Sequence, residues 1–404
     1  MALIYMDIAK KFSRIAKRIK KQFKRINPPH DIWLAVKTAA ILLFIAAIIL
    51  EYFESRPEIP ADDIGDKVGQ MLMIGFRGTQ APPDSYIAKA VNDLNLGGVI
   101  LFDRDVPSGA AGRNITNYGQ TKQLVSQLKS YSTKSTLLVA VDAEGGLINR
   151  LKPSLGFIDI PSAKDLGQDP AAAINDYWNL AKELADLGFN VNFAPVVDLD
   201  VNPENPVIGA LERSYSADPQ VVATLARTLI AAHKSFGIIT SLKHFPGHGS
   251  SDSDSHLGLP DITLTWNETE LKPYEQLIKD GAADSVMTAH IIDKNIDPDY
   301  PATLSPKFIQ DILRQRLGFD GVVFSDDMQM GAIVDNYGFE DAIVRAVNAG
   351  CDILVLSNNG SVYDETIPYR AKDTILKAVR DGRISRERID QAYGRIQKLK
   401  EKIH

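Results

Sequence analysis

The chain alternates between short apolar runs and longer amphipathic stretches, and this alternation restricts its possible folds more than any other feature. Eight runs are rich in aliphatic and β-branched residues, which is typical of strands buried on both faces of a parallel sheet. These runs are residues 70–76, 98–102, 137–142, 190–199, 238–244, 285–290, 321–325 and 352–356. Eight strand–helix units within about 340 residues predict an α/β fold, a (β/α)8 TIM-like barrel. An open doubly wound sheet has the same alternation and is the alternative.

The stretches between these runs have apolar residues at intervals of three and four, the spacing of one helical face. The predicted helices are residues 86–94, 122–128, 171–187, 221–236, 270–278, 306–317 and 340–348, and residues 364–403 are predicted to form one or two more. No internal repeat or second boundary interrupts the pattern. We therefore interpret residues 64–404 as one barrel domain.

Polar residues stand at or just after the ends of four of the predicted strands. They are Asp142 and Glu144, then Lys243 and His244, then His290, and finally Asp326 and Asp327. In a barrel of this kind the carboxyl ends of the strands open on one face, and that face carries the active site. We expect these four strand ends to meet at one mouth.

The densest group of titratable side chains lies in residues 243–256, which hold three histidines, a lysine and two aspartates. Glycines and a proline in this stretch predict an irregular loop after a strand. Such a concentration of titratable groups is typical of an active-site loop. Within it, Asp254 and His256 are alternate residues, and an aspartate beside a histidine fixes its tautomer and raises its basicity.

Asp326 follows the apolar residues 322–324, so its side chain is expected to emerge at the rim of the barrel. A carboxylate there can act as a nucleophile, a base, a metal ligand or a hydrogen-bond acceptor that stabilises the fold. Its neighbour Asp327 could instead cap the next helix.

A metal site is the main chemical alternative for this loop. Five side chains are of types that bind metals: His244, His248, Asp252, Asp254 and His256. Their spacing matches no zinc signature, and Lys243 would lie beside the cation. The chain has one cysteine, so a cysteine-based site is not indicated either. We expect no metal and no cofactor.

The amino-terminal segment differs in charge from the rest of the chain. The net charge is −6, yet residues 1–32 carry nine basic residues against Asp7 and Asp31. Apolar residues recur at intervals of three and four, which places them on one face of a predicted helix and the lysines and arginines on the other. The apolar residues are Ile8, Phe12, Ile15, Ile19, Phe23 and Ile26. A cationic amphipathic helix of this kind suits anionic membrane lipids better than nucleic acid. A merely solvated basic run is the alternative.

Residues 33–53 contain the apolar stretch 38–50, with Trp33 on one side and Tyr52 and Phe53 on the other. About 20 residues suffice to span a bilayer, and the basic flank predicts a cytoplasmic N-terminus. We expect a transmembrane signal anchor, a linker over residues 54–63, and a catalytic domain outside the cytoplasmic membrane. A buried core helix and a cleaved signal peptide are the alternatives.

Taken together, the motifs resemble glycoside hydrolase family 3, and within it the β-N-acetylhexosaminidase branch. The resemblance covers about residues 64–400 and includes 97–102, 142–146 with Arg150, 192–196, 205–209 with 213–215, 243–249, 254–256 and 324–328. The most specific element is Lys243-His-Phe-Pro-Gly-His-Gly249 followed by Asp254-Ser-His256.

The resemblance implies two-step, retaining hydrolysis of a terminal β-linked N-acetylglucosamine. Asp326 is then the nucleophile, and His256, oriented by Asp254, is the general acid and later the base, where most retaining enzymes use a second carboxylic acid. A histidine suits this role because its ordinary pKa of about 6.5 lies near the working pH. The residues that resemble sugar-binding ones are Asp142, Arg150, Arg213, Lys243 and His244. His290 is a further candidate because of its strand-end position.

Two departures from the family pattern are Leu147, where relatives commonly have an arginine, and a longer join between Gly209 and Arg213. The expected substrate is a glycan from peptidoglycan-derived saccharides. The alternatives are a β-glucosidase or β-xylosidase of the same family and a non-catalytic saccharide-binding protein. No nucleic acid partner is expected, and the oligomeric state stays open.

Overall fold

The computed structural model describes residues 61–255, 258–360 and 362–403, which belong to one compact unit, Ala61–His404. The predicted basic arm (1–32), the predicted span (33–53) and most of the predicted linker lie outside the described residues, so these assignments stay predictions. Within the described residues no helix has both the length and the apolar character needed to cross a membrane.

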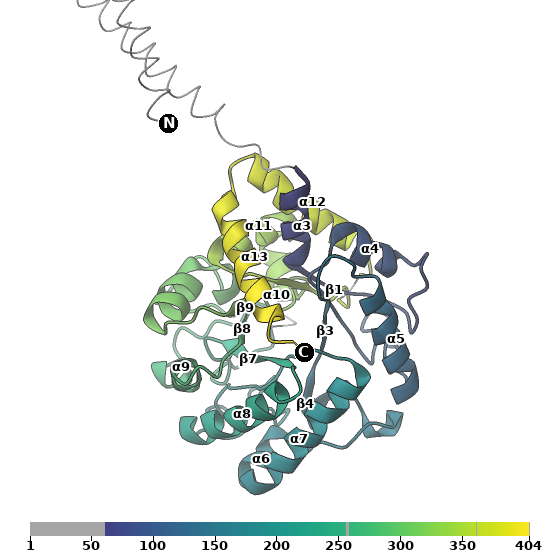
Figure 1. The fold of residues 1–404 in the computed structure, drawn as a ribbon. Helices are drawn as coiled ribbons and strands as arrows, with labels where there is room; N and C mark the ends of the chain where they lie inside the picture. The colour runs from purple at the N-terminus through teal and green to yellow at the C-terminus, as the bar shows by residue number, and fades with distance from the viewer. Residues whose placement is uncertain (1–60, 256–257, 361, 404) are drawn as a thin grey trace, which may run out of the picture. The chain divides into compact units, whose positions relative to one another are not determined.

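An eight-stranded parallel sheet forms the centre of this unit (Figure 1). Its strands, in spatial order, are β10 (Leu354–Leu356), β1 (Leu72–Gly75), β2 (Gly98–Ile100), β3 (Leu138–Val141), β6 (Val191–Asn192), β7 (Ile239–Phe245), β8 (Ser285–Thr288) and β9 (Val322–Phe324). Each strand overlaps one of the eight predicted runs, and every strand residue is buried. Burial on both faces explains why the runs are rich in apolar residues and do not alternate strictly between apolar and polar ones.

The two edge strands, β9 and β10, approach each other through main-chain hydrogen bonds. The amides of Asp352 and Ile353 donate to the carbonyl of Val323 at 2.8 and 3.1 Å, and the amide of Ser325 donates to the carbonyl of Ile353 at 2.9 Å. The sheet therefore closes almost completely into a barrel. This result favours the predicted barrel over an open doubly wound sheet.

Helices surround the sheet on its outer side (Figure 1). The longer ones are α3 (Ala61–Gln70), α4 (Tyr86–Leu94), α5 (Tyr118–Ser130), α7 (Pro170–Leu187), α8 (Pro219–Lys234), α9 (Lys272–Lys279), the π-helix η4 (Lys307–Arg316), α11 (Phe339–Ala349), α12 (Ile367–Arg380) and α13 (Arg386–Lys400). All seven predicted helices are confirmed, and residues 364–403 contain two helices. The α7 helix shows the local signals: Asp169 accepts a hydrogen bond from Ala172 N, Pro170 is its first residue, and Gly188 ends it at φ 90°.

Several short elements were not predicted. They are the helices α6 (Ala163–Gln168) and α10 (Gly331–Tyr337), the 3₁₀ turns η1 (Pro153–Leu155), η2 (Glu268–Leu271) and η3 (Ala302–Leu304), and a hairpin of β4 (Ala143–Gly145) and β5 (Ile148–Asn149). The hairpin follows β3 directly, so it lies at the carboxyl end of the barrel. It positions Glu144 and Arg150, two side chains of the cavity described next.

Candidate active site

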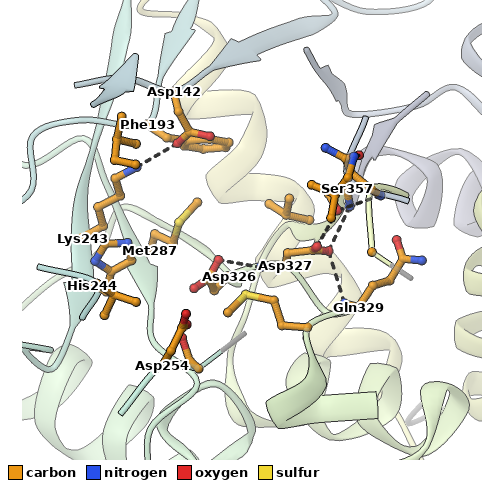
Figure 2. Close-up of a pocket in the computed structure, with 18 of the residues that line it drawn as sticks. Asp142, Phe193, Lys243, His244, Asp254, Met287, Asp326, Asp327, Gln329 and Ser357 are labelled. Carbon is orange, nitrogen blue, oxygen red and sulfur yellow. Dashed lines mark hydrogen bonds and ion pairs between the residues drawn. The ribbon is translucent and has the colours of Figure 1, made fainter. Parts of the chain in front are cut away.

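A cavity of about 690 Å³ opens at the carboxyl ends of the strands (Figure 2). Seven of the nine predicted site residues line it: Asp142, Arg150, Arg213, Lys243, His244, Asp254 and Asp326. They come from the ends of β3, β7 and β9 and from the loops that follow β6 and β7. Of the four predicted strand ends, three bring their polar side chains to this mouth, and His290, at the end of β8, does not line it.

Lys243 is the centre of a buried ionic network in this cavity. Its Nζ lies 2.8 Å from Asp142 Oδ1 and 2.6 Å from Glu144 Oε1, and Lys243 is 2% exposed. Burial lowers the pKa of Lys243, but Asp142 and Glu144 more than offset this effect, so the pKa stands above its ordinary value. The lysine therefore remains a charged donor next to the space a substrate would fill.

Glu144 is held from its other side by Arg213. The guanidinium donates two hydrogen bonds to the carboxylate, from Nε to Oε2 at 2.8 Å and from Nη2 to Oε1 at 2.7 Å. Burial raises the pKa of Glu144, yet Arg213 and Lys243 bring it down to about 2. Glu144 was quoted in the sequence motif but not predicted as a site residue, because its role depends on an arginine 69 positions away.

The longer join before Arg213 does not displace this side chain from the cavity. The amide of Ala210 donates to Asn205 O at 2.9 Å, that of Arg213 donates to Ile208 O at 3.0 Å, and Arg213 Nη1 donates to Val207 O at 2.8 Å. The extra residues thus form a compact turn that directs the guanidinium inward.

His244 is oriented by Asp198, a residue that the sequence analysis missed. Asp198 Oδ2 lies 2.7 Å from His244 Nδ1, and the same carboxylate accepts main-chain hydrogen bonds from His244 and His248. Arg213 Nη2 lies 3.3 Å from His244 Nε2. Because arginine can only donate, Nε2 accepts, and the proton of a neutral ring lies on Nδ1.

The charge of Asp198 is stabilised by these contacts. Burial raises its pKa, but His244 and the surrounding donors outweigh burial and hold the pKa below its ordinary value. One feature of the sequence could have indicated this role: Asp198 lies within the apolar stretch 196–199. A carboxylate buried there requires hydrogen-bond donors around it.

Asp326 and Asp327 have different surroundings although they are neighbours. Both line the cavity, and Asp326 accepts the amide of Asp327 at 2.7 Å. The carboxylate of Asp327 accepts the amides of Ser357 at 2.9 Å and Gln329 at 3.2 Å, and also the Ser357 hydroxyl. Burial raises the pKa of Asp327. Asp327 therefore fastens the turn after β9 to the turn after β10, and it does not cap a helix.

His290 was predicted to bind substrate, but the structure places it behind the wall of the cavity. It is fully buried, with Nδ1 2.9 Å from Thr303 Oγ1 and Nε2 2.9 Å from Asp327 O. The strand-end rule located it correctly along the strand. The side chain points at the main chain of Asp327, so it supports the turn that carries Asp326.

The carboxylates of Asp254 and Asp326 point toward each other in the cavity (Figure 2). His256 lies outside the described residues, so its pairing with Asp254 stays a prediction. Among the described residues no group of three or more His, Cys, Asp or Glu side chains is arranged to hold a metal ion. His244, one of the possible ligands, has both ring nitrogens beside Asp198 and Arg213.

Glu270 supports the loop from behind and was also not predicted. Its Oε2 accepts the amide of Gly249 at 3.0 Å, and it packs against Gly247, where a Cβ would lie 2.6 Å from the Glu270 Cβ. Gly247 has φ +118°, so only glycine suits this position on both counts. Burial raises the pKa of Glu270 to about 7.

Replacing Glu270 with glutamine is expected to change how stability depends on pH. The carboxyl titrates at about 7 in the folded protein, against an ordinary 4.5, so its ionisation destabilises the fold. As the pH rises from 4.5 to about 7, the free energy of unfolding of the parent should fall by up to about 3 kcal/mol relative to that of the variant. Urea unfolding at about pH 5 and about pH 8 measures the difference. If the free energies of unfolding of parent and variant differ by the same amount at both pH values, the raised pKa of Glu270 is contradicted.

The arrangement suits a polyhydroxylated ligand. Charged donors and acceptors alternate around the cavity, which is of ordinary size for a small-molecule site. A carboxylate, Asp326, lies among them with one side toward the open space. This combination fits covalent chemistry on a sugar ring.

Comparison with known proteins agrees with this geometry. Residues 63–399 match the family model described as "Glycosyl hydrolase family 3 N terminal domain". The chain is 37% identical over 295 residues to a β-hexosaminidase of Tolumonas auensis, covering 71% of this chain and 83% of that protein. It is 34% identical over 294 residues to a β-hexosaminidase of Pseudomonas aeruginosa, covering 71% and 82%.

Solved structures give the same result. A glycoside hydrolase family 3 β-N-acetylglucosaminidase from Paenibacillus superposes with a TM-score of 0.75 at 36% identity, over 84% of this chain and 62% of that one. A β-N-acetylhexosaminidase from Beutenbergia cavernae gives 0.74 at 30% identity, over 84% and 98%. The family model alone spans most of the chain. The protein therefore belongs to glycoside hydrolase family 3 and is a glycoside hydrolase.

Proposed function

We propose that the protein is a retaining exo-β-N-acetylglucosaminidase, which removes terminal β-linked N-acetylglucosamine. The observation that carries this proposal is the position of Asp326, at the end of β9 and in one cavity with Asp254, Lys243 and Arg213. The similarity to proteins named β-hexosaminidase and β-N-acetylglucosaminidase supports the choice of sugar.

In the proposed first step, Asp326 attacks the anomeric carbon of the bound sugar. A bond forms between a carboxylate oxygen and the anomeric carbon, and the bond from that carbon to the leaving oxygen breaks. His256 gives its proton to the leaving oxygen, and Asp254 orients the imidazole. The products are a free alcohol and a glycosyl ester on Asp326.

The second step reverses these roles. His256, now neutral, removes a proton from water, and the water oxygen attacks the anomeric carbon. The ester bond breaks, and Asp326 is released as a carboxylate. Two inversions at one carbon retain the configuration.

The ionic network provides the sugar contacts in this proposal. Asp142 accepts from sugar hydroxyl groups, whereas Lys243, Arg150 and Arg213 donate. Each of the three cations is held by a carboxylate before substrate arrives, so little ordering is needed on binding. His244, oriented by Asp198, acts as a further hydrogen-bonding group.

The natural substrate and location are proposed from the amino-terminal segment. The predicted basic arm and span, residues 1–53, support an enzyme anchored in the cytoplasmic membrane with its barrel on the outer side. Glycans derived from peptidoglycan are the β-linked N-acetylglucosamine source on that side.

Turnover of aryl β-N-acetylglucosaminide, measured beside the aryl β-glucoside and β-xyloside, tests the proposal. We expect kcat/KM for the N-acetylglucosaminide to exceed the others by at least about 100-fold, because buried donors that lose a partner reject analogues lacking it. A preference for glucoside or xyloside would assign another sugar. Binding of N-acetylglucosamine without turnover of any substrate would indicate a saccharide-binding protein.

A further inference from the structure

Four cationic side chains line the cavity: Arg104, Arg150, Arg213 and Lys243. Three of them have a carboxylate partner, which is Asp103 for Arg150 at 3.7 Å, Glu144 for Arg213, and Asp142 with Glu144 for Lys243. Throughout the described part of the chain, the guanidinium of Arg104 forms no ion pair and no hydrogen bond. Arg104 is exposed, so its charge is available to a ligand at the mouth.

The main chain around Arg104 is held firmly, although its side chain is not. Asn359 Nδ2 donates to Arg104 O at 3.1 Å, and Val106 N donates to Asn359 Oδ1 at 2.9 Å. The adjacent Asp105 is occupied by Arg77 at 2.9 Å and by Arg113. Neither this carboxylate nor a flexible loop therefore competes for the guanidinium.

The neighbouring side chains leave the guanidinium uncovered. On its amino-terminal side, Asp103 pairs with Lys152 at 2.9 Å. The side chain of Arg104 itself lies beside Gly109, where a Cβ would approach Nη2 to 3.8 Å. Because glycine has no side chain, nothing from this position covers the guanidinium.

Arg104 also lies on a different part of the rim from the proposed sugar contacts. Asp142 and Lys243 follow β3 and β7, whereas Arg104 follows β2 and its anchor Asn359 follows β10. Asn359 N donates to Ser357 Oγ at 3.1 Å, and Figure 2 shows Ser357 on the opposite side of Asp326 from Lys243. A substrate whose reacting sugar contacts Lys243 would extend its leaving group past Asp326 toward this side.

We infer that Arg104 binds a carboxylate on the leaving-group sugar and so makes the enzyme selective for acidic glycans. This inference rests on the proposed function. A guanidinium can donate two parallel hydrogen bonds to a carboxylate, and an arginine without an internal partner loses no ion pair when it does so. Val106, which is 62% exposed and lines the same rim, provides apolar contact for the carbon skeleton of that sugar.

Two pairs of synthetic disaccharides test the inference on the full chain. In each, β-N-acetylglucosamine is linked to a sugar that carries a carboxylate, either as an ether-linked lactyl group or as a uronic acid. Each acid is compared with its methyl ester, which has nearly the same shape and no charge. We expect the parent to favour at least one acid over its ester in kcat/KM by about 10-fold or more, the value of one good charged hydrogen-bonded pair.

Arg104→Ala is expected to bring that ratio close to 1, and Arg104→Lys to retain part of it, because lysine keeps the charge but not the paired donors. Lys152→Ala is the matched control: it removes a nearby cation that does not line the cavity, and the ratio should stay at the parental value. The pair of substrates that responds identifies the source of the carboxylate.

Three results would overturn the inference. The first is a parental ratio near 1 for both pairs, the second is a ratio that survives in Arg104→Ala, and the third is an equal fall in Lys152→Ala. All three leave the proposed function intact, since the disaccharides are still cleaved. If the parent cleaves no disaccharide and no aryl N-acetylglucosaminide, the proposed function fails and the inference fails with it.

Discussion

Asp326→Ala is expected to lower kcat/KM for an aryl β-N-acetylglucosaminide by about 10⁴-fold or more, with the fold intact. Removing the nucleophile of a covalent mechanism removes the first chemical step, and losses of this order are typical when such a group is deleted. The side chain lines the cavity and accepts a main-chain hydrogen bond from Asp327 N, a neighbour in the same turn. Initial rates measure the loss of activity, and thermal unfolding of the same variant shows whether its stability has changed.

Added azide should partly restore turnover by this variant. The space left by the carboxylate admits a small anion, which can attack the anomeric carbon from the face that Asp326 used. One displacement then replaces two, so the product is the α-glycosyl azide and the configuration is inverted. Identification of that product by NMR would establish which face Asp326 serves.

Asp327→Asn is the matched control for this experiment. The two aspartates are adjacent, but Asp327 is occupied by Ser357 and Gln329. Its replacement should mainly destabilise the turn after β9, and azide should restore nothing. If azide rescued Asp327→Asn and not Asp326→Ala, the two roles would have to be exchanged.

The fold was predictable because its signals are local. A strand buried on both faces is rich in apolar residues, and all eight runs with this composition contain strands of the barrel. The carboxyl-end rule then placed Asp142, Lys243, His244 and Asp326 at one cavity, whereas Arg150 and Arg213 were predicted from the family resemblance. Neither step requires knowledge of a contact between distant residues.

The predictions fell short where a role depends on distant contacts. Glu144, Asp198 and Glu270 each act through a partner brought close only by folding: Arg213, His244 and Gly249. A single sequence does not reveal such pairs. For His290 the strand end was predicted correctly, but the direction of the side chain is set by Thr303 and Asp327.

The α7 helix shows the same limit for packing. Ile174 and Trp178 recur at helical spacing, yet they are 59% and 50% exposed, while Ala173 and Tyr177 one position earlier are buried. Both sets have the period of a helical face. Which face turns inward depends on the neighbours, and here α8 packs beside it.

His256→Ala is expected to act unequally on substrates with different leaving groups. A general acid matters most when the leaving oxygen is strongly basic, as in a sugar, and least when it is a dinitrophenolate. We expect kcat/KM for a disaccharide to fall by about 10²- to 10⁴-fold and that for the dinitrophenyl glycoside to change little. A plot of log kcat/KM against leaving-group pKa, steeper in the variant than in the parent, is the measurement.

The same variant should also lose the base of the second step. With the dinitrophenyl glycoside, formation of the Asp326 ester stays fast while its hydrolysis slows, so the ester accumulates. Rapid mixing should then show a burst of phenolate that matches the enzyme concentration, followed by a slow steady rate. Asp254→Asn, which retains the imidazole but not the charge beside it, should give smaller changes in both measurements. An equal loss on every leaving group, without a burst, would instead mean that His256 holds the loop, because a positioning role does not depend on the basicity of the leaving oxygen.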